Sequence, residues 1–346
     1  MSYLSSQYIQ CETIQAMLDE QFTLSNAPLD PMPALEAILA TQKANGISQS
    51  VADGSGKVKT IKVVYDQRLL ESAVTEGSGA RSCTTTTETF DNYTTYTIDP
   101  TVWLEAKEKF DTVDLATVCT ADVQAMIAKK INKIIDVLDR SVATKTAEEL
   151  VGLTGVWSSD VTANVANELE IATVVSEATQ VLSYAGITKL DTSLMQTAYN
   201  APIIVGGTKL YNYGKALNAG CCSTTGVNIL DLYNQYGKAF LYDKRIKAAL
   251  ADDNKGIVFN AGAVALITYN EAPQVPNLGA NYAKMRVNSP RTGIPYDIVM
   301  NDTCGTISIL GYANTKLVGL PTDMFAVGDE YRGVTLVNKI KVVNPA

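Results

Sequence analysis

The sequence predicts a mixed α+β fold in which one long helix precedes many short strands. Apolar residues spaced three or four positions apart from Val123 to Val142 indicate the helix. Short apolar runs separated by turn residues, such as PIIVGG at 202–207, indicate the strands. Because these elements are intermixed, we expect an α+β protein whose later strands pair largely antiparallel.

Composition limits the classes of function that the chain can have. Its 346 residues, 46 % hydrophobic and 18 % charged, are enough for one large domain or two to three subdomains. The formal net charge is −8 and no block of Lys or Arg stands out, which argues against binding in a nucleic-acid groove. The chain has no histidine, the commonest general base and metal ligand, so we expect no enzyme, no cofactor and no metal.

Targeting and redox signals are also weak. The first fifteen residues lack a basic region followed by an apolar one, so we expect no signal peptide. No run of about 18 apolar residues occurs, so we expect no membrane contact. None of the six cysteines forms a Cys-x-x-Cys pair, and we expect free thiols.

Residues 1–52 are predicted to form an N-terminal arm. Two short helical patterns, Ile9–Phe22 and Pro33–Lys43, flank the turn-rich sequence SNAPLDPMP. The segment carries too little apolar surface for a core of its own, so it is expected to lie against something else.

Residues 53–100 are predicted to form an extended β-loop. One strand is expected at Val58–Tyr65 and the returning strand at Thr84–Ile98, with the glycine-containing link TEGSGARS between them. Phe90, Tyr96 and Ile98 share one face by the period of two. An isolated two-stranded ribbon is marginal in water, so this ribbon needs a partner.

A helix is predicted over 120–150, with Thr120 as its N-cap and Gly152 just past its end, about 45 Å long at 1.5 Å per residue, within a domain spanning 101–163. Its apolar stripe is expected to face a core. The opposite, solvated side is expected to carry Lys129, Lys130, Lys133, Asp136, Asp139 and Arg140. Trp103 and Trp157 flank this helix and are expected to anchor packing, with interface anchoring as the alternative.

The rest of the chain alternates short helices and strands, divided into a domain at 164–290 and returning strands at 291–346. Helices are expected at 164–185, closed by Gly186, and at 208–220. Strands are expected at 202–207, 238–243, 256–262, 263–270, 294–302, 306–314 and 334–343.

The sequence motifs that could indicate an enzyme are incomplete or unsuitably arranged. GSGARS lacks the final glycine of a dinucleotide-binding loop and opens no helix, so it is expected to be a turn. The carboxylate pairs Glu148/Glu149 and Asp252/Asp253 are adjacent in sequence and diverge in direction, so they are expected to be solvated.

The order of arm, β-loop, long helix, mixed body and late strands resembles the major capsid proteins of tailed double-stranded DNA bacteriophages, which have the HK97-type fold. GIVFNAGAVALITYN at 256–270 and the ending from GIPYDIVMNDTCG onward are similar to strands of such proteins. The resemblance implies an N-terminal arm, an E-loop at 53–100, a peripheral domain carrying the spine helix, a mixed α/β axial domain, and C-terminal strands that return to the axial and peripheral domains.

The resemblance also implies a function. The chain is expected to self-assemble into hexamers and pentamers of an icosahedral head that encloses double-stranded DNA without reading its sequence. Portal, scaffold and cement proteins are the further partners expected, with assembly in the host cytoplasm and a final place in the virion. The E-loop residues expected to contact a neighbouring subunit are Gly77, Gly79, Arg81, Phe90, Tyr93 and Tyr96.

Two other functions stay open at this point. An encapsulin-like shell that loads enzyme cargo shares the same architecture. A carboxylate-based hydrolase with a β-rich binding domain is the third possibility. Some capsid proteins cross-link a loop lysine to a neighbour, but the partner residues for Lys57, Lys59 or Lys62 are not recognisable here.

Overall fold

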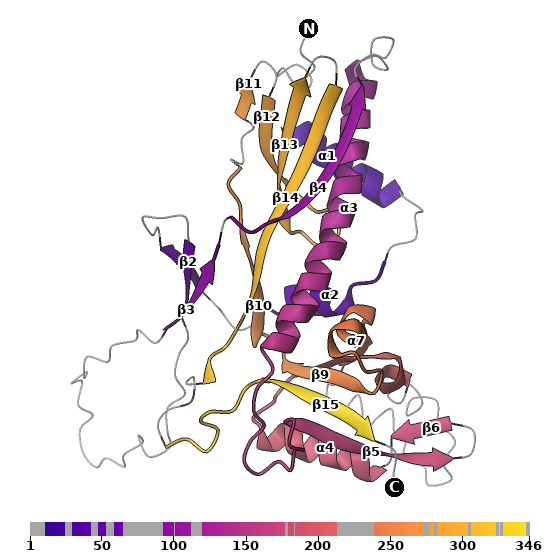
Figure 1. Cartoon of the computed structure of the whole chain (residues 1–346), viewed down its shortest axis with the longest axis vertical. Coiled ribbons are helices and arrows are strands. Elements are labelled where there is room, and N and C mark those ends of the chain that lie inside the picture. The colour runs from indigo at the N-terminus through magenta and orange to yellow at the C-terminus, as the bar shows by residue number, and fades with distance from the viewer. Residues whose placement is uncertain are drawn as a thin grey trace, which may run out of the picture.

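The structure, a computed structural model, is elongated and carries two six-stranded sheets that follow one another along its long axis (Figure 1). It describes residues 11–24, 30–42, 48–52, 59–64, 93–99, 101–111, 120–176, 179–182, 184–212, 239–272, 277–279, 282–303, 306–322, 325 and 328–343. Helices and strands mix as the sequence predicts, so the α+β class is confirmed.

The upper sheet in Figure 1 is entirely antiparallel. Its strands run in the order β10-β14-β13-β12-β11, and β4 also pairs with β14. Their bounds are β4 Leu104–Asp111, β10 Val264–Tyr269, β11 Asn277–Gly279, β12 Tyr282–Asn288, β13 Pro295–Thr303 and β14 Thr306–Gly319. Burial alternates along β14, as expected for a strand with one face on a core.

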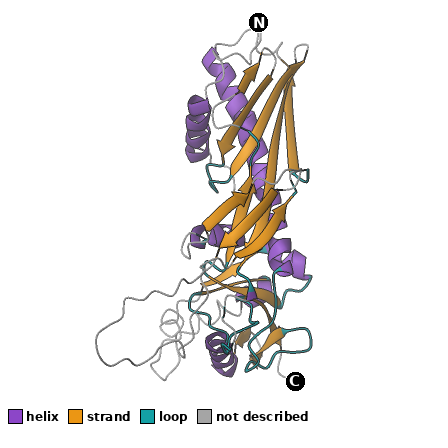
Figure 2. Ribbon diagram, turned by 90° about the vertical axis from the view of Figure 1, so that its left-hand side faces the viewer, coloured by secondary structure: helices purple, strands orange, loops and turns teal. Residues whose placement is uncertain are grey.

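One face of this sheet packs on α3 (Thr120–Gly152) and α1 (Cys11–Leu24). The predicted apolar stripe of α3 is confirmed, since Ile127, Ile131, Ile134, Leu138 and Val142 are at most 1 % exposed. The side chain of Val123 lies outside the described residues. Figure 2 shows the helices along one face of the upper sheet, and the other face carries no helix among the described residues.

The lower sheet has the order β6-β5-β15-β9-β7-β8. Its strands are β5 Glu168–Ser176, β6 Thr179–Leu182, β7 Pro202–Gly206, β8 Ala239–Tyr242, β9 Lys255–Asn260 and β15 Val337–Val343. The flanking helices are α4 (Tyr184–Gln196) and α7 (Lys244–Leu250), and Asp243 caps α7 by accepting a hydrogen bond from the backbone N–H of Arg245.

The helix predicted at 164–185 is wrong. This stretch forms β5 and β6, and the helix begins only at Tyr184. Leu169, Ile171 and Thr173 alternate into the core, and β5 pairs in parallel with β15 far along the chain. The β-branched residues favoured a strand, and this long-range pairing outweighed the helix formers around them.

A small third sheet forms the base of the predicted β-loop. It pairs β1 (Ser48–Ala52), β2 (Lys59–Val64) and β3 (Tyr93–Ile98), all antiparallel. The strand at 48–52 was not predicted, because it lies in the stretch assigned to the arm. The strand expected at Val58–Tyr65 is confirmed as β2, and the returning strand is confirmed from Tyr93 onward, while 84–92 lie outside the described residues.

The other predicted elements are found with small shifts. The arm helices are α1 and α2 (Pro33–Thr41), and the predicted strands from 202 onward coincide with β7–β10 and β13–β15. The helix expected at 208–220 is present over 208–212, and the rest of it lies outside the described residues. Strands β10–β12 fall within the predicted domain 164–290 but belong to the upper sheet, on which α3 packs. The sheets therefore do not divide at the predicted boundary of 290.

Candidate interaction surfaces

The base of the β-loop is held to the body through β3. The hydroxyl of Tyr96 donates to the carbonyl oxygen of Gly319 at 2.6 Å. Ile98 is 3 % exposed and packs with Ala265, Ile267 and Val318 of the upper sheet. The part of the ribbon nearest the body therefore finds its apolar partner within its own chain.

The predicted loop contacts lie at or beyond this base. Tyr96 is half-buried against its own subunit, and its predicted contact with a neighbour stays a prediction. The backbone of Tyr93 pairs with Val64, but its side chain is not described. Gly77, Gly79, Arg81 and Phe90 lie outside the described residues.

A groove lies on the uncovered face of the upper sheet, close to the loop base. Trp103 is 49 % exposed, and its ring meets that of Tyr312 edge to face, with centroids 6.0 Å apart and planes at 87°. The groove has a volume of about 210 Å³. It is lined by Trp103, Tyr269, Glu271, Lys284, Asp297, Val299, Tyr312 and Asn314. We call it the Trp103 groove.

Polar contacts fix the walls of the Trp103 groove. Asp297 accepts hydrogen bonds from the backbone N–H of Glu271 at 2.6 Å and from Nδ2 of Asn270 at 3.1 Å. Nδ2 of Asn314 donates to the carbonyl oxygen of Asp99 at 2.9 Å. This last bond joins the groove to the segment that leaves β3, so groove and loop base form one continuous region.

The two tryptophans have different roles. Trp157 is 3 % exposed, its Nε1 donates to the Lys339 carbonyl oxygen at 3.2 Å, and its ring packs on Tyr199, so its predicted role as a packing anchor is confirmed. The same prediction is wrong for Trp103. No layer covers its side of the sheet among the described residues, and the alternative, an interface anchor, stays a prediction.

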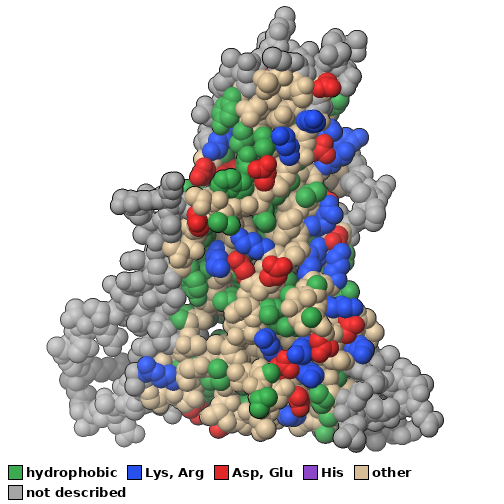
Figure 3. Space-filling model, viewed as in Figure 1, with side chains coloured by type: hydrophobic (Ala, Val, Ile, Leu, Met, Phe, Trp, Pro, Cys, Tyr) green, Lys and Arg blue, Asp and Glu red, His purple; other side chains and the backbone are tan. Residues whose placement is uncertain are grey.

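Charges of both signs surround the groove. Figure 3 shows Lys, Arg, Asp and Glu side chains scattered among hydrophobic ones over the face seen in Figure 1. Glu105, Lys107 and Lys109 of β4 are exposed, and the backbones of the last two pair with Leu310 and Ser308 of β14. A mixed polar rim around exposed aromatic side chains is typical of protein–protein interfaces.

Three of the four paired carboxylates make structural contacts, and the fourth, Glu148, is exposed as predicted. Glu149 is half-buried and accepts a hydrogen bond from the backbone N–H of Leu317 at 2.7 Å, so its prediction as solvated is wrong. Asp253 pairs with Lys247 at 2.8 Å, and Asp252 accepts from the backbone N–H of Asn254 at 2.9 Å. The Glu149 contact joins α3 to β14, and the Asp253 contact holds the C-terminal part of α7.

The solvated position predicted for Asp139 is also wrong, since this residue of α3 is 3 % exposed. Its carboxylate accepts hydrogen bonds from the hydroxyls of Tyr296 at 2.6 Å, Ser289 at 2.7 Å and Thr292 at 3.0 Å. Burial raises the pKa of Asp139 above its usual value, and these three hydrogen bonds partly oppose that shift. The sequence signal was a Ser-x-x-Thr pair in the β12–β13 turn, which supplies two of the three donors.

The described ranges contain no group of three or more Cys, Asp and Glu side chains placed to hold a metal ion. Nor does any described helix combine the length and apolar character needed to cross a membrane. The cysteine side chains lie outside the part of the chain whose side chains are described, so the thiol prediction is untested.

The fold and these surfaces define a mixed α/β protein with an exposed aromatic groove and a loop anchored at its base. No protein-family model and no curated protein match the chain. Similar solved structures exist. The capsid of Myoviridae phage XM1 is 12 % identical over 92 % of this chain and 94 % of that chain, with a TM-score of 0.44.

Two further similar structures are phage capsids as well. The mature capsid of bacteriophage PhiM1 is 11 % identical, covering 85 % of this chain and 84 % of that one, with a TM-score of 0.39. The capsid of cyanophage P-SCSP1u is 12 % identical, covering 85 % and 86 %, with a TM-score of 0.35. All three similar structures have a TM-score below 0.5.

Proposed function

We propose that the chain is a major capsid protein, which self-assembles into hexamers and pentamers of an icosahedral head that encloses double-stranded DNA. The observation that carries the proposal is the loop base. Among the described contacts, β3 joins the three-stranded sheet to the body, at β14 and through Ile98. In this proposal residues 65–92, which connect β2 to β3 and lie outside the described residues, form a ribbon that reaches a neighbouring copy. Because an isolated two-stranded ribbon is marginal in water, it gains its stability from that copy.

The Trp103 groove is the surface that we assign to this association. Exposed aromatic residues are enriched at interfaces, because each buries a large area at a low cost in conformational entropy. Val102 is 61 % exposed and Trp103 49 % exposed, side by side next to the loop base. Contact with a second copy removes both from water.

Charge supports pairing between the ribbon and a neighbour. Residues 65–92 contain five carboxylates and two arginines, a net charge of −3. Lys107 and Lys109 are exposed on the face that holds the groove. An acidic ribbon laid beside these lysines has favourable electrostatics, which also help to set its orientation.

The overall charge of −8 suits a shell around DNA. A basic lining binds phosphate regardless of sequence and hinders movement of the packaged duplex. In this proposal the shell encloses DNA without sequence-specific contacts. Portal, scaffold and cement proteins act as separate partners, assembly takes place in the host cytoplasm, and the product resides in the virion.

Electron microscopy of the purified full-length chain tests the proposal. Closed shells are expected from the wild type, and folded subunits or capsomers without closed shells are expected after deletion of residues 70–95. Normal shells from the deletion would contradict the assignment of the loop. A native protein that stays monomeric at all concentrations would overturn the capsid function itself.

The contents of native particles distinguish two kinds of shell. Double-stranded DNA inside, with a portal at one vertex, supports the capsid. Particles filled with a protein cargo and no nucleic acid indicate an encapsulin-like compartment instead.

The Trp103 groove has its own test. Trp103→Ala is expected to keep the melting temperature within a few degrees but to reduce shell yield at least several-fold. Met195→Ala is the matched control, because Met195 is also apolar and 59 % exposed but lies on α4 of the lower sheet. Equal yields from both variants would remove the groove from the interface.

A further inference from the structure

Residues 30–42 lie where the two sheets meet, and they contact both. We call this segment the strut. Its apolar side chains Met32, Ala34, Leu35 and Ile38 are at most 2 % exposed and belong to the main core cluster. At its end, Oε1 of Gln42 accepts a hydrogen bond from the backbone N–H of Leu266, in β10 of the upper sheet.

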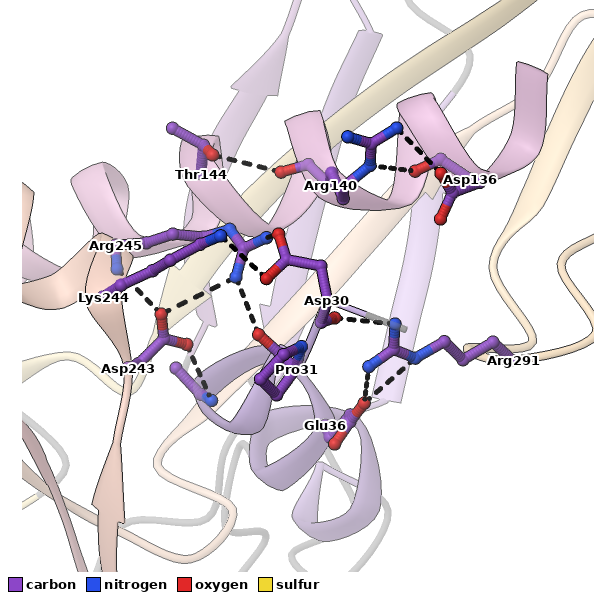
Figure 4. A network of polar contacts seen from close by, with 11 residues as sticks. Asp30, Pro31, Glu36, Asp136, Arg140, Thr144, Asp243, Lys244, Arg245 and Arg291 are labelled. Atoms are coloured by element: carbon purple, nitrogen blue, oxygen red, sulfur yellow. Dashed lines mark hydrogen bonds and ion pairs between the residues drawn. The ribbon is translucent and has the colours of Figure 1, made fainter. Parts of the chain in front are cut away.

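The start of the strut is bound to the lower sheet through α7 (Figure 4). Arg245 donates from Nη2 to Oδ2 of Asp30 at 2.7 Å and from Nη1 to the carbonyl oxygen of Pro31 at 2.9 Å. Lys244 pairs with Oδ1 of Asp30 at 2.7 Å. The side chain of Arg245 is only 6 % exposed, so solvent screens this attachment little.

A second attachment to the lower sheet uses the backbone. The N–H of Ala34 donates to Oδ2 of Asp243 at 3.2 Å, while Oδ1 of Asp243 accepts from the backbone N–H of Arg245. Asp243 therefore caps α7 and binds the first turn of α2 at once. Figure 4 shows the side chains of Asp243, Lys244 and Arg245 converging on this turn.

The same part of the strut is bound to the upper sheet by one side chain of the β12–β13 turn. Arg291 donates from Nη2 and Nε to Oε1 of Glu36, at 2.7 and 3.2 Å, and from Nη1 to the carbonyl oxygen of Asp30 at 2.8 Å. Asp30 is therefore bound from both sheets, by its carboxylate from below and by its carbonyl from above.

Three segments of the chain link the upper body to the lower sheet, 153–167, 261–263 and 320–336, and the shortest of them includes a glycine. Only residues 261–263 join β9 of the lower sheet to β10 of the upper sheet, and Gly262 has a φ of +76°. A few residues at the end of a strand are enough to absorb a change in the angle between two bodies. The strut bridges the two bodies separately from this link.

We infer that the strut sets the angle between the two sheets, and that the Arg291–Glu36 pair is its releasable attachment. The Glu36 side chain is 47 % exposed and that of Arg291 only 14 %, so water and salt reach this pair more readily than the buried Arg245 attachment. When the pair opens, α2 remains on α7, and the sheets stay joined by their shared core and by α3, which packs on α7, so that the upper sheet gains a limited tilt. A subunit that must fit more than one environment in a closed shell needs such an adjustment, although the inference itself does not depend on the proposed function.

Distances between fluorophores on the two sheets test this inference in the full-length, unassembled chain. Non-natural amino acids at Tyr282 of β12 and at Val165, which precedes β5, carry the labels, since both positions are exposed. Arg291→Gln is expected to broaden the distance distribution between them at least twofold, whereas wild type gives a single narrow peak. Salt near 1 M, where the screening length is about 3 Å, is expected to broaden the wild-type distribution in the same direction.

Arg140→Gln is the matched control. It makes the same chemical change in an ion pair with Asp136 that lies within α3 alone, at 2.7 Å. Exchanging the charges, Arg291→Glu with Glu36→Arg, is expected to narrow the distribution again. A wild-type distribution for Arg291→Gln overturns the inference, as does equal broadening by Arg140→Gln. Because melting temperature is recorded for each variant, a general loss of folding is distinguished from movement between the sheets.

Discussion

Tyr296 donates its hydroxyl hydrogen to Oδ1 of Asp139 at 2.6 Å, in a site that excludes water from both side chains. Ser289 and Thr292 complete a set of three neutral donors around one carboxylate. The relationship joins the middle of α3 to the β12–β13 hairpin. It fixes the position of Arg291 as well, because Oγ of Ser289 accepts from the backbone N–H of Arg291 at 3.2 Å.

Removing the Tyr296 hydroxyl is expected to destabilise the protein. Hydrogen bonds to charged groups contribute about 1.5–3 kcal/mol, so Tyr296→Phe should lower the free energy of unfolding by that amount. Urea denaturation measures the effect, and Tyr282→Phe on the exposed end of β12 is the control. A change below about 0.5 kcal/mol for Tyr296→Phe would show that the donor is not needed.

Asp139 also predicts a pH dependence. Its pKa is raised by burial, so the folded protein takes up this proton at a higher pH than the unfolded chain, whose Asp pKa is about 3.9. The contribution of this group to stability is therefore fully present below about pH 4 and is lost as pH rises through the folded pKa. Asp139→Asn removes this dependence.

The comparison is made by urea unfolding of wild type and Asp139→Asn at a series of pH values from about 4 to 7. The free energy of unfolding of wild type minus that of the variant is expected to decrease as pH rises. Asp243, whose pKa burial also raises, and Asp30, whose pKa is lowered by Lys244 and Arg245 against the opposing effect of burial, are present in both proteins and cancel. A difference that stays constant or increases would contradict the assignment.

Gly311 is expected to tolerate no side chain. A methyl group there would collide with Cγ2 of Ile134 and crowd Leu138, on the face of β14 that rests on α3. Because a filled core responds to an added carbon with strain, Gly311→Ala should cost about 1–3 kcal/mol. Gly152→Ala, where no atom lies within 4 Å of the added carbon, is the control and should be neutral or slightly stabilising. Equal thermal melting of the two variants would refute the close approach.

The loop base is expected to open locally when its apolar contact is lost. Ile98→Ala removes the side chain that β3 inserts among Ala265, Ile267 and Val318. Hydrogen exchange of residues 59–64 and 93–98 should become at least tenfold faster, while the core of α3 keeps its protection. The exposed neighbour Thr97→Ala should leave both unchanged. Uniform acceleration across the chain would mean instead that β3 is part of the global folding unit.

Local patterns predicted α1, α2, α3 and most strands, because the spacing of apolar residues along the chain determines which side of such an element is buried. Helices α4 and α7 were not predicted. The long helix is the best example, since its stripe from Ile127 to Val142 is buried in the core as predicted. Strand β5 has two partners: β6 follows it directly, but β15 lies about 170 residues away, and a window of sequence contains no information on that second pairing. Strand β4 was not predicted either, since its charged residues alternate with half-buried ones rather than with strongly apolar ones.

The surfaces were predicted less well than the fold. The spacing that placed Asp139 with the solvated residues of α3 was correct for the isolated helix, but it could not include the hairpin that covers this position. In the same way Trp103 was assigned to the core on its residue type, whereas its face of the sheet is uncovered among the described residues. Both errors arise from contacts between segments distant in sequence.

The middle of the lower sheet is made by one of its latest strands. Strand β15 lies between β5 and β9. The backbone N–H and C=O groups on the facing edges of β5 and β9 therefore have no strand to pair with until β15 has left the ribosome. During synthesis these two strands therefore expose unpaired backbone edges, which are prone to pair with other chains. We expect nascent chains stopped near residue 330 to aggregate or to recruit chaperones, and the completed chains to be protected from both.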